Sequence, residues 1–227
     1  MLNCSKLLNG VLLASVLMFA PIASVHASVN LLVNGSFESG AFAPNGEGFE
    51  SLNPGATDIF GWTVTNNEMA WGSNTNIYGL TSSDGDKFLD LTGYHNYSPY
   101  GGVAQTINTI VGRTYTVSFD IGDSTNLNPL LNGPVAVESA AGTADKVFYL
   151  DPSTSGNLWH RYTYEFVASD TTTNVSFTGA AGVDYIGLDN ASVTLNPVPE
   201  ASTVILFVLC AGGIFLVSRR KAAHTIA

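Results

Sequence analysis

The chain contains only two cysteines, and neither lies in its central part. Cys4 is close to the start and Cys210 is inside an apolar stretch near the end, so residues 28–197 have none. This central part therefore has no disulfide and no thiol chemistry, and packing, hydrogen bonds or a metal must stabilise it. It is long enough to bury a core without cross-links, with about 70% of its unfolded surface removed from water.

Basic residues are also scarce, because the sequence has 8 Lys and Arg against 18 Asp and Glu. Four of the basic residues lie near the two ends, which leaves residues 28–197 with four basic and seventeen acidic side chains and a net charge near −13. Such a surface repels nucleic acid and other polyanions, so we expect no nucleic-acid partner. It tolerates neutral glycans and attracts divalent cations.

Catalytic signatures are lacking as well. The central part has only two histidines, His95 and His160, and no His-x-x-x-His pair, nucleophile elbow or phosphate-binding glycine loop. We therefore expect a protein that is not an enzyme. Carboxylates are plentiful, so a glycosidase-type carboxylate pair remains an open alternative.

The first 27 residues have the layout of a secretory signal peptide. Lys6 precedes an apolar stretch at Leu7–Ala20, and Val25 and Ala27 place small residues at the −3 and −1 positions before Ser28. This layout predicts a signal helix, export through the Sec pathway and cleavage by signal peptidase. A retained membrane helix is the alternative, but the apolar stretch is short and is followed by a processing site.

Residues 198–227 combine a short motif, an uncharged apolar run and a basic cluster. The run Ala201–Val217 would reach roughly 25 Å as a helix, slightly short of the ~30 Å hydrocarbon core of a bilayer. The basic residues after it favour the cytoplasmic side, which leaves everything upstream outside. The sequence thus predicts a C-terminal transmembrane helix. The motif and the cluster consist of Val198, Pro199, Glu200, Arg219, Arg220 and Lys221.

Together these features resemble the PEP-CTERM sorting signal of Gram-negative bacteria, although Ala201 stands where that family usually has a second proline. The resemblance implies recognition by an exosortase, which would cleave near the motif. It also implies an exported protein that the C-terminal helix anchors in the inner membrane before processing. Afterwards the protein would lie at the cell surface or in the extracellular matrix. An ordinary tail-anchoring helix is the alternative.

Residues 28–197 are expected to form a single all-β domain. In two stretches, 114–121 and 161–166, apolar and polar residues alternate with period two, which indicates a sheet with one buried face. Gly40–Gly55 and Asp123–Pro134 are expected loops. A chain with this many short strands fits a double-sheet sandwich. The expected strands are Asn30–Val33, Ile59–Thr65, Glu68–Trp71, Lys87–Leu91, Gly102–Ile107, Thr114–Ile121, Val135–Glu138, Lys146–Leu150, Trp159–Val167, Thr173–Thr178 and Tyr185–Leu195.

Several segments carry a second resemblance because of their order along the chain. The domain opens with Asn34-Gly35-Ser36-Phe37-Glu38, continues through Gly85-Asp86-Lys87-Phe88-Leu89-Asp90 and closes with Gly187-Leu188-Asp189-Asn190. In this order they resemble the galactose-binding-like jelly rolls. These include the choice-of-anchor C proteins, related plant cell-wall domains of unknown function and, more distantly, family 4 carbohydrate-binding modules. The resemblance implies a β-sandwich of two antiparallel sheets. The closing strand changes apolar parity at Asp189-Asn190, which predicts a β-bulge.

The same resemblance implies a structural calcium ion where the first and last strands meet. Calcium takes six to eight oxygen ligands from carboxylates and backbone carbonyls. The family's ligands fall on Glu38, Asp189, the carbonyl of Ser36 and carbonyls near Asp84 and Lys87. A cation would relieve the repulsion between two carboxylates brought together. In the alternative, Glu38 and Asp189 accept hydrogen bonds from backbone amides at strand ends.

Aromatic residues offer a carbohydrate-binding surface. The turn-rich segment 93–101 contains Tyr94, His95, Asn96, Tyr97 and Tyr100, and Trp71 belongs to a second cluster with Asn74, Asn76 and Tyr78. Aromatic rings stack on the C–H faces of sugars, while Asn and His reach the hydroxyl groups. Core packing is the alternative for several of these rings, and we assign Trp62 and Trp159 to the core because of their strand parity.

The sequence therefore predicts a non-catalytic protein that attaches to, or organises, extracellular polysaccharide, with calcium supporting its fold. A purely structural matrix component without a specific glycan is the second hypothesis. A glycan-active enzyme is the third.

Overall fold

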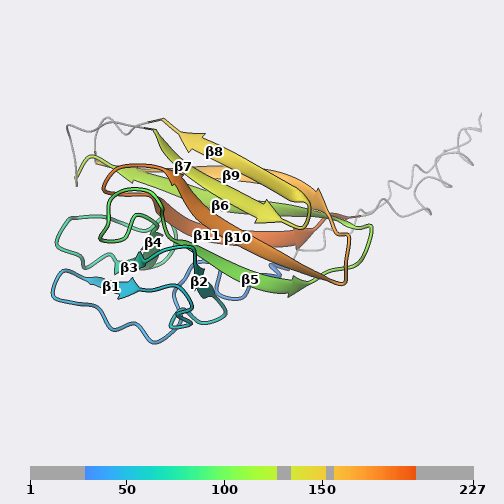
Figure 1. Cartoon of the computed structure of the whole chain (residues 1–227), viewed down its shortest axis with the longest axis horizontal. Coiled ribbons are helices and arrows are strands. Elements are labelled where there is room, and N and C mark those ends of the chain that lie inside the picture. Colours follow the sequence, from blue (N-terminus) through green and yellow to red (C-terminus); the bar gives the residue numbers. More distant parts are fainter. Residues whose placement is uncertain (1–28, 127–133, 152–155, 198–227) are drawn as a thin grey trace, which may run out of the picture. The chain divides into compact units, whose positions relative to one another are not determined.

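The structure is a computed structural model that describes residues 29–126, 134–151 and 156–197 (Figure 1). Ser28–Pro197 form one compact unit, and its described residues contain eleven strands and no helix. The predicted signal helix and transmembrane helix, and the six sorting residues Val198, Pro199, Glu200, Arg219, Arg220 and Lys221, lie outside the described residues. In the part that the structure describes, no helix is long and apolar enough to cross a membrane.

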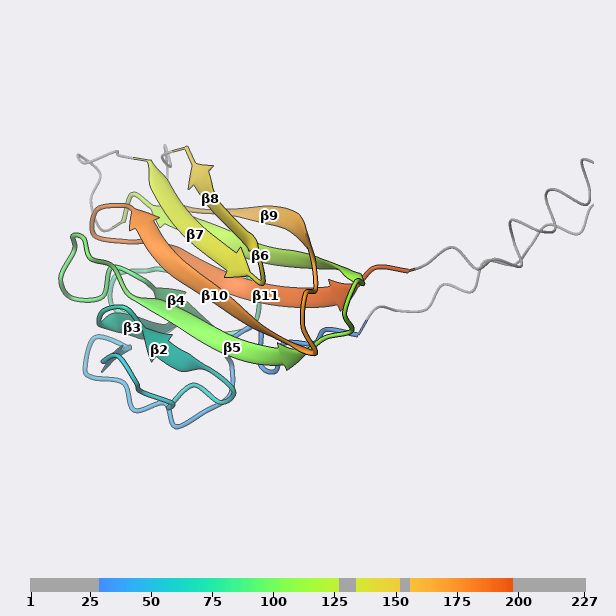
Figure 2. The ribbon, with the colours of Figure 1, turned by 45° about the vertical axis from the view of Figure 1, so that its right-hand side comes forward.

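The strands form two antiparallel sheets that pack face to face (Figures 1 and 2). In order across the six-stranded sheet lie β1 (Phe49–Leu52), β3 (Met69–Ser73), β4 (Lys87–Asp90), β11 (Gly187–Leu195), β6 (Thr114–Ser124) and β9 (Asn157–Val167). The five-stranded sheet consists of β2 (Thr63–Thr65), β5 (Gly102–Asn108), β10 (Thr172–Ala181), β7 (Val135–Ala141) and β8 (Ala144–Leu150). Every strand pairing is antiparallel, which confirms the predicted β-sandwich.

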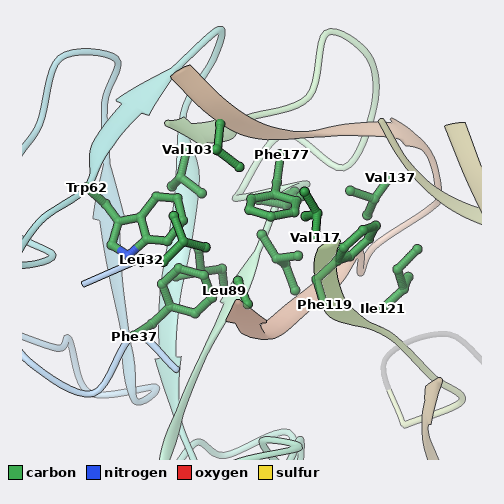
Figure 3. Packing of buried hydrophobic residues seen from close by; sticks show 14 of the residues in the cluster. Leu32, Phe37, Trp62, Leu89, Val103, Val117, Phe119, Ile121, Val137 and Phe177 are labelled. Carbon is green, nitrogen blue, oxygen red and sulfur yellow. The ribbon is translucent and has the colours of Figure 1, made fainter. Parts of the chain in front are cut away.

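The main core fills the space between the two sheets (Figure 3). The predicted alternation in β6 holds, because Val117 and Phe119 are fully buried between the sheets. The ring of Phe177 lies 5.0 Å from that of Phe119 and 6.1 Å from that of Trp62 (centroid to centroid), so aromatic packing continues along the core. Burying such side chains contributes about 2–3 kcal/mol each before entropy is counted.

Three sequence predictions about strands are corrected. Asn30–Val33 is not a strand but leads into a turn, although the N–H of Leu31 still bonds the carbonyl of Val193. The expected strand Ile59–Thr65 is reduced to β2. Strand β1 lies inside Gly40–Gly55, which was expected to be a loop. The bulge predicted at Asp189-Asn190 is confirmed, because the register between β11 and β6 shifts between Asp189 and Ser192.

A second, smaller apolar cluster lies on the outer face of the six-stranded sheet. It comprises Phe49, Ala70, Leu80, Phe88 and Tyr185, with Tyr78 and Trp159 packed against it. Glycines in the sheet leave space for the large rings of this cluster. A Cβ on Gly122 would lie 2.8 Å from the Trp159 ring, and one on Gly187 would lie 2.6 Å from the Tyr185 hydroxyl. Trp159, predicted as a core residue, therefore packs outside the main core.

Candidate functional site

The turn at residues 82–87 brings together most of the residues predicted to bind calcium. Glu38 Oε1 accepts hydrogen bonds from the backbone N–H groups of Asp86 (2.8 Å) and Lys87 (2.7 Å). Asp189 Oδ2 accepts hydrogen bonds from the N–H groups of Ser83 (2.8 Å) and Asp84 (2.9 Å). One turn thus joins the opening and closing segments of the domain.

These carboxylates are already occupied by hydrogen-bond donors, so their arrangement does not fit a cation. Asp189 Oδ1 accepts the N–H of Asn190 at 2.6 Å, and Lys87 Nζ lies 3.6 Å from Glu38 Oε2. Burial raises the pKa of Asp189 to about 7, while the backbone N–H donors lower it. Among the residues that the structure describes, no three His, Cys, Asp or Glu side chains are grouped as metal ligands would be. Ser36 lies in the opening turn. Calcium binding stays a prediction, and the geometry favours the backbone-amide alternative.

A pocket of about 300 Å³ lies on the outer face of the six-stranded sheet, next to the second apolar cluster. Its floor includes Ala70 and Asp90, which are cross-strand neighbours on β3 and β4. Rings from three separate segments surround this floor. The lining residues are Phe49, Ala70, Tyr78, Asp90, Gly93, Tyr94, Asn96 and Asp184.

Asp90 is the most deeply buried polar group of the pocket, with only 5% of its surface exposed. Its Oδ1 accepts three hydrogen bonds, from the N–H of Thr92 (3.0 Å), the hydroxyl of Thr92 (2.7 Å) and the N–H of Ile186 (3.1 Å). Its Oδ2 accepts none from the described residues. Burial raises the pKa of Asp90 to about 7, against the lowering effect of these hydrogen bonds, and the negative charge of Glu68 raises it further.

Glu68 fixes the segment that carries Tyr94 and Asn96. Its carboxylate is 5% exposed, and its Oε2 accepts the backbone N–H of Tyr94 at 3.0 Å and contacts His95 Nδ1 at 2.8 Å. Its Oε1 accepts the hydroxyl of Ser51 at 2.6 Å. Gly93, at a φ of 58°, packs directly against this carboxylate, where a Cβ would clash. The buried carboxylate of Glu68 thus fixes the position of the segment that carries Tyr94 and Asn96.

The rim of the pocket is also hydrogen-bonded. The hydroxyl of Tyr94 accepts a bond from Asn45 Nδ2 at 2.6 Å and donates one to Glu47 Oε2 at 3.3 Å. Burial raises the pKa of this phenol, and nearby Glu47 raises it too, so Tyr94 stays neutral and keeps its donor. The ring of Tyr94 remains half exposed, which leaves it available to a ligand.

The predicted carbohydrate-binding residues separate into three groups. Tyr94 and Asn96 line the pocket, while His95 bonds Glu68 and the exposed Tyr97 packs its ring 6.3 Å from that of His95. Trp71 and Tyr100 were assigned wrongly, because both belong to the main core. Trp71 Nε1 donates to the carbonyl of Phe37 at 3.0 Å, and the hydroxyl of Tyr100 donates to the carbonyl of Gly182 at 2.8 Å.

Sequence reasoning missed Phe49 and Asp90 as parts of this site, whereas Tyr78 belonged to the second aromatic cluster that the sequence indicated. Asp90 had a usable signal: it is a polar residue between Leu89 and Leu91, both of which are buried in the main core. Period two therefore places Asp90 on the opposite face of the strand. Phe49 had no such signal, since β1 was not expected.

A second, broader depression of about 640 Å³ crosses the outer face of the five-stranded sheet. Uncharged polar side chains dominate its lining, including Thr65, Asn174, Ser176 and Thr178. Tyr100 also lines the depression but belongs to the main core, so the depression offers no free aromatic face among its lining residues.

Comparison with known families assigns the domain to a family. A family model described as a protein of unknown function, DUF642, matches residues 30–185. The chain belongs to the DUF642 family. A curated relative, "Protein DUF642 L-GALACTONO-1,4-LACTONE-RESPONSIVE GENE 2" of Arabidopsis thaliana, is 27% identical over 180 residues, which cover 77% of this chain and 44% of the relative. The chain thus spans less than half the length of that relative.

Solved structures with a similar fold include several carbohydrate-binding modules. A family 4 module has a TM-score of 0.38 and 17% identity, covering 73% of this chain and 99% of the module. A family 35 module from Clostridium thermocellum has a TM-score of 0.41 and 12% identity, with coverages of 63% and 97%. A family 61 module in complex with β-1,4-galactotriose has a TM-score of 0.40 and 16% identity, with coverages of 74% and 100%. These are similarities of fold only.

DUF642 membership corrects two of the resemblances drawn from the sequence, those to PEP-CTERM proteins and to choice-of-anchor C proteins. The domain matches DUF642 and not the choice-of-anchor C proteins, and the matched relative is a plant protein, so recognition as a PEP-CTERM protein was wrong. The expected exosortase partner depended on that recognition and is withdrawn.

The predicted localisation is corrected for the same reason. It assumed a bacterial inner-membrane anchor before processing, then the cell surface or matrix. The matched relative comes from Arabidopsis thaliana, and the described part of the chain has no membrane-spanning helix. Residues 201–217 themselves lie outside the described residues. The division into residues 1–27, 28–197 and 198–227 stays a prediction.

Proposed function

We propose that the domain binds carbohydrate, without catalysis, in the pocket beside β3 and β4. The observation that carries this proposal is the pairing of aromatic faces with a few fixed polar groups in one concave site. Phe49, Tyr78 and Tyr94 supply rings for the apolar faces of a sugar, and Asp90 and Asn96 supply polar atoms for its hydroxyl groups. A volume of about 300 Å³ is at the small end of ligand pockets and suits one or two sugar rings.

The site is prepared before a ligand arrives, which lowers the entropic cost of binding. Glu68 holds the Tyr94 segment, Thr92 and Ile186 hold Asp90, and Asn45 holds the Tyr94 hydroxyl. A ligand therefore meets side chains that already have fixed positions. Extracellular polysaccharide is the partner class that such a site would serve.

A glycan array probed with the full chain tests this function. We expect selective signals that fall about tenfold in Tyr94→Ala, since loss of a stacking ring removes about 1.5 kcal/mol of contact energy. Tyr149→Ala is the matched control, because Tyr149 is an equally accessible tyrosine, 63% exposed, on β8 of the other sheet. Absence of selective signal would support a structural role without a specific glycan. Release of shorter products from a bound glycan would overturn the non-catalytic part of the proposal.

A further inference from the structure

The pocket contains acidic groups and no basic one. Asp90 and Asp184 line it, and Glu47 bonds the Tyr94 hydroxyl at its rim. Three of the basic side chains that the structure describes interact with groups outside the pocket. Lys87 pairs with Glu38, Arg161 pairs with Asp120, and Lys146 lies 5.6 Å from the centroid of the Tyr164 ring. No lysine, arginine or histidine is among the lining residues.

Among the described residues, none donates a hydrogen bond to Asp90 Oδ2. Only 5% of Asp90 is exposed, and the three hydrogen bonds that it accepts from described residues all reach Oδ1. No described ion pair involves it. A buried carboxylate without a counter-charge is costly, and a bound cation that donates a hydrogen bond to Oδ2 would remove that cost.

The remaining walls also suit a cation. The rings of Tyr78, Tyr94 and Phe49 border the same space, and the face of an aromatic ring attracts a positive charge within about 6 Å. Aromatic walls and a carboxylate floor are compatible with a neutral sugar, but together with the absence of basic lining residues they favour a ligand that carries a positive charge.

We propose that the pocket selects a sugar that bears a protonated amine, with the ammonium group donating a hydrogen bond to Asp90 Oδ2. This inference rests on the carbohydrate-binding function proposed above and specifies its ligand class. The carboxylate of Glu47, and that of Asp90 once it is ionised, would repel a sugar carboxylate. An N-acetylated sugar keeps the ring but loses the charge, so it binds more weakly than the free amine.

Calorimetric titration of the full chain with three oligosaccharides of one linkage tests this selection. The probes are β-1,4-linked oligomers of glucosamine, of N-acetylglucosamine and of glucose, at neutral pH, where an ionised Asp90 and a protonated amine are both present. We expect the glucosamine oligomer to bind about tenfold more tightly than the other two, as a charge-assisted hydrogen bond to a buried carboxylate would give. Asp90→Asn should abolish this preference and keep the fold, because the Asn amide oxygen can still accept the bonds from Thr92 and Ile186.

A control separates the pocket from general attraction to an acidic protein. Asp145→Asn removes the same charge from exposed strand β8, and it should leave the preference intact. If neutral oligomers bind and Tyr94→Ala weakens them, but the amine adds no affinity, the present inference fails and the carbohydrate-binding function stands. If Asp90→Asn and Asp145→Asn lower the amine preference equally, the pocket does not select the charge. If no oligosaccharide binds in this titration or on the array, both proposals fall.

Discussion

The carboxylate of Glu68 accepts the backbone N–H of Tyr94 at 3.0 Å, and the same oxygen contacts His95 Nδ1 at 2.8 Å. A residue next to strand β3 thereby fixes the segment that supplies one wall of the pocket. This buried acid lies beneath the site without lining it, so its effect on a ligand acts through the position of Tyr94.

Replacing Glu68 should therefore affect both stability and binding. Glu68→Ala leaves the N–H of Tyr94 and the hydroxyl of Ser51 without their acceptor, which costs about 1–3 kcal/mol of unfolding free energy. Sugar affinity should fall severalfold, and Glu68→Gln, which keeps one acceptor oxygen, should lie in between. Urea denaturation and calorimetry measure the two effects. Glu165→Ala is the control, since Glu165 is an exposed glutamate with a single side-chain bond to Asn196. Unchanged sugar affinity in Glu68→Ala would refute the positioning role.

Asp189 should be among the most sensitive polar positions of the domain. It is fully buried and accepts the N–H groups of Ser83, Asp84 and Asn190. Asp189→Ala leaves these donors unpaired and should cost about 2–4 kcal/mol, because each buried unpaired donor is expensive. Asp145→Ala, at an exposed position on β8, should change the unfolding free energy by less than about 0.5 kcal/mol. Equal effects in urea denaturation would show that the turn at residues 82–87 does not stabilise the domain.

Calcium should have little influence on stability. Glu38 and Asp189 already accept backbone N–H groups, and a cation would have to displace those donors. We expect the melting temperature of the full chain to be the same in excess calcium and in chelator. A clear rise with calcium that disappears in Glu38→Ala would restore the metal site implied by the sequence resemblance.

Stability should decrease as the pH rises from about 5 to 8. Burial raises the pKa of Asp90 and of Asp189 from the ordinary 3.8 to about 7, so the folded state holds protons that the unfolded state has released. The stabilising effect is complete below pH 3.8 and is lost as the pH approaches 7. Urea denaturation at pH 5 and pH 8 measures the change. The unfolding free energy of Asp90→Asn should change less between these two pH values than that of the unmodified chain. An identical change would show that Asp90 does not contribute to the pH dependence.

Much of the sandwich could be predicted because its strands obey local rules. The alternation around Phe119 predicted β6, and the change of apolar parity at Asp189-Asn190 predicted the bulge in β11. Both predictions depend only on which face of a single strand is buried. Strand β1 was missed because Phe49–Leu52 has too few residues to show a period, and its pairing with β3 is a tertiary event.

The site was harder to predict, because it depends on which face each ring occupies. Strand β3 is buried at all five positions, so no alternation of polar and apolar residues shows which face each side chain occupies. Trp71 was therefore predicted to contact a sugar, although it packs in the main core. Tyr94 and Asn96 were found because they lie in a turn-rich segment. Phe49 joins them only through the pairing of β1 with β3, which no local pattern encodes, and Tyr78 joins them from a turn between β3 and β4.

Hydrogen exchange of the full chain, with and without the glycan that binds best, tests the central claim most directly. The account predicts that the glycan slows exchange in the segments that form the pocket, residues 76–80 and 90–97, and leaves β5 and β10 unchanged. Protection confined to β5 and β10, on the other sheet, would contradict it and would place the ligand in the broader depression there.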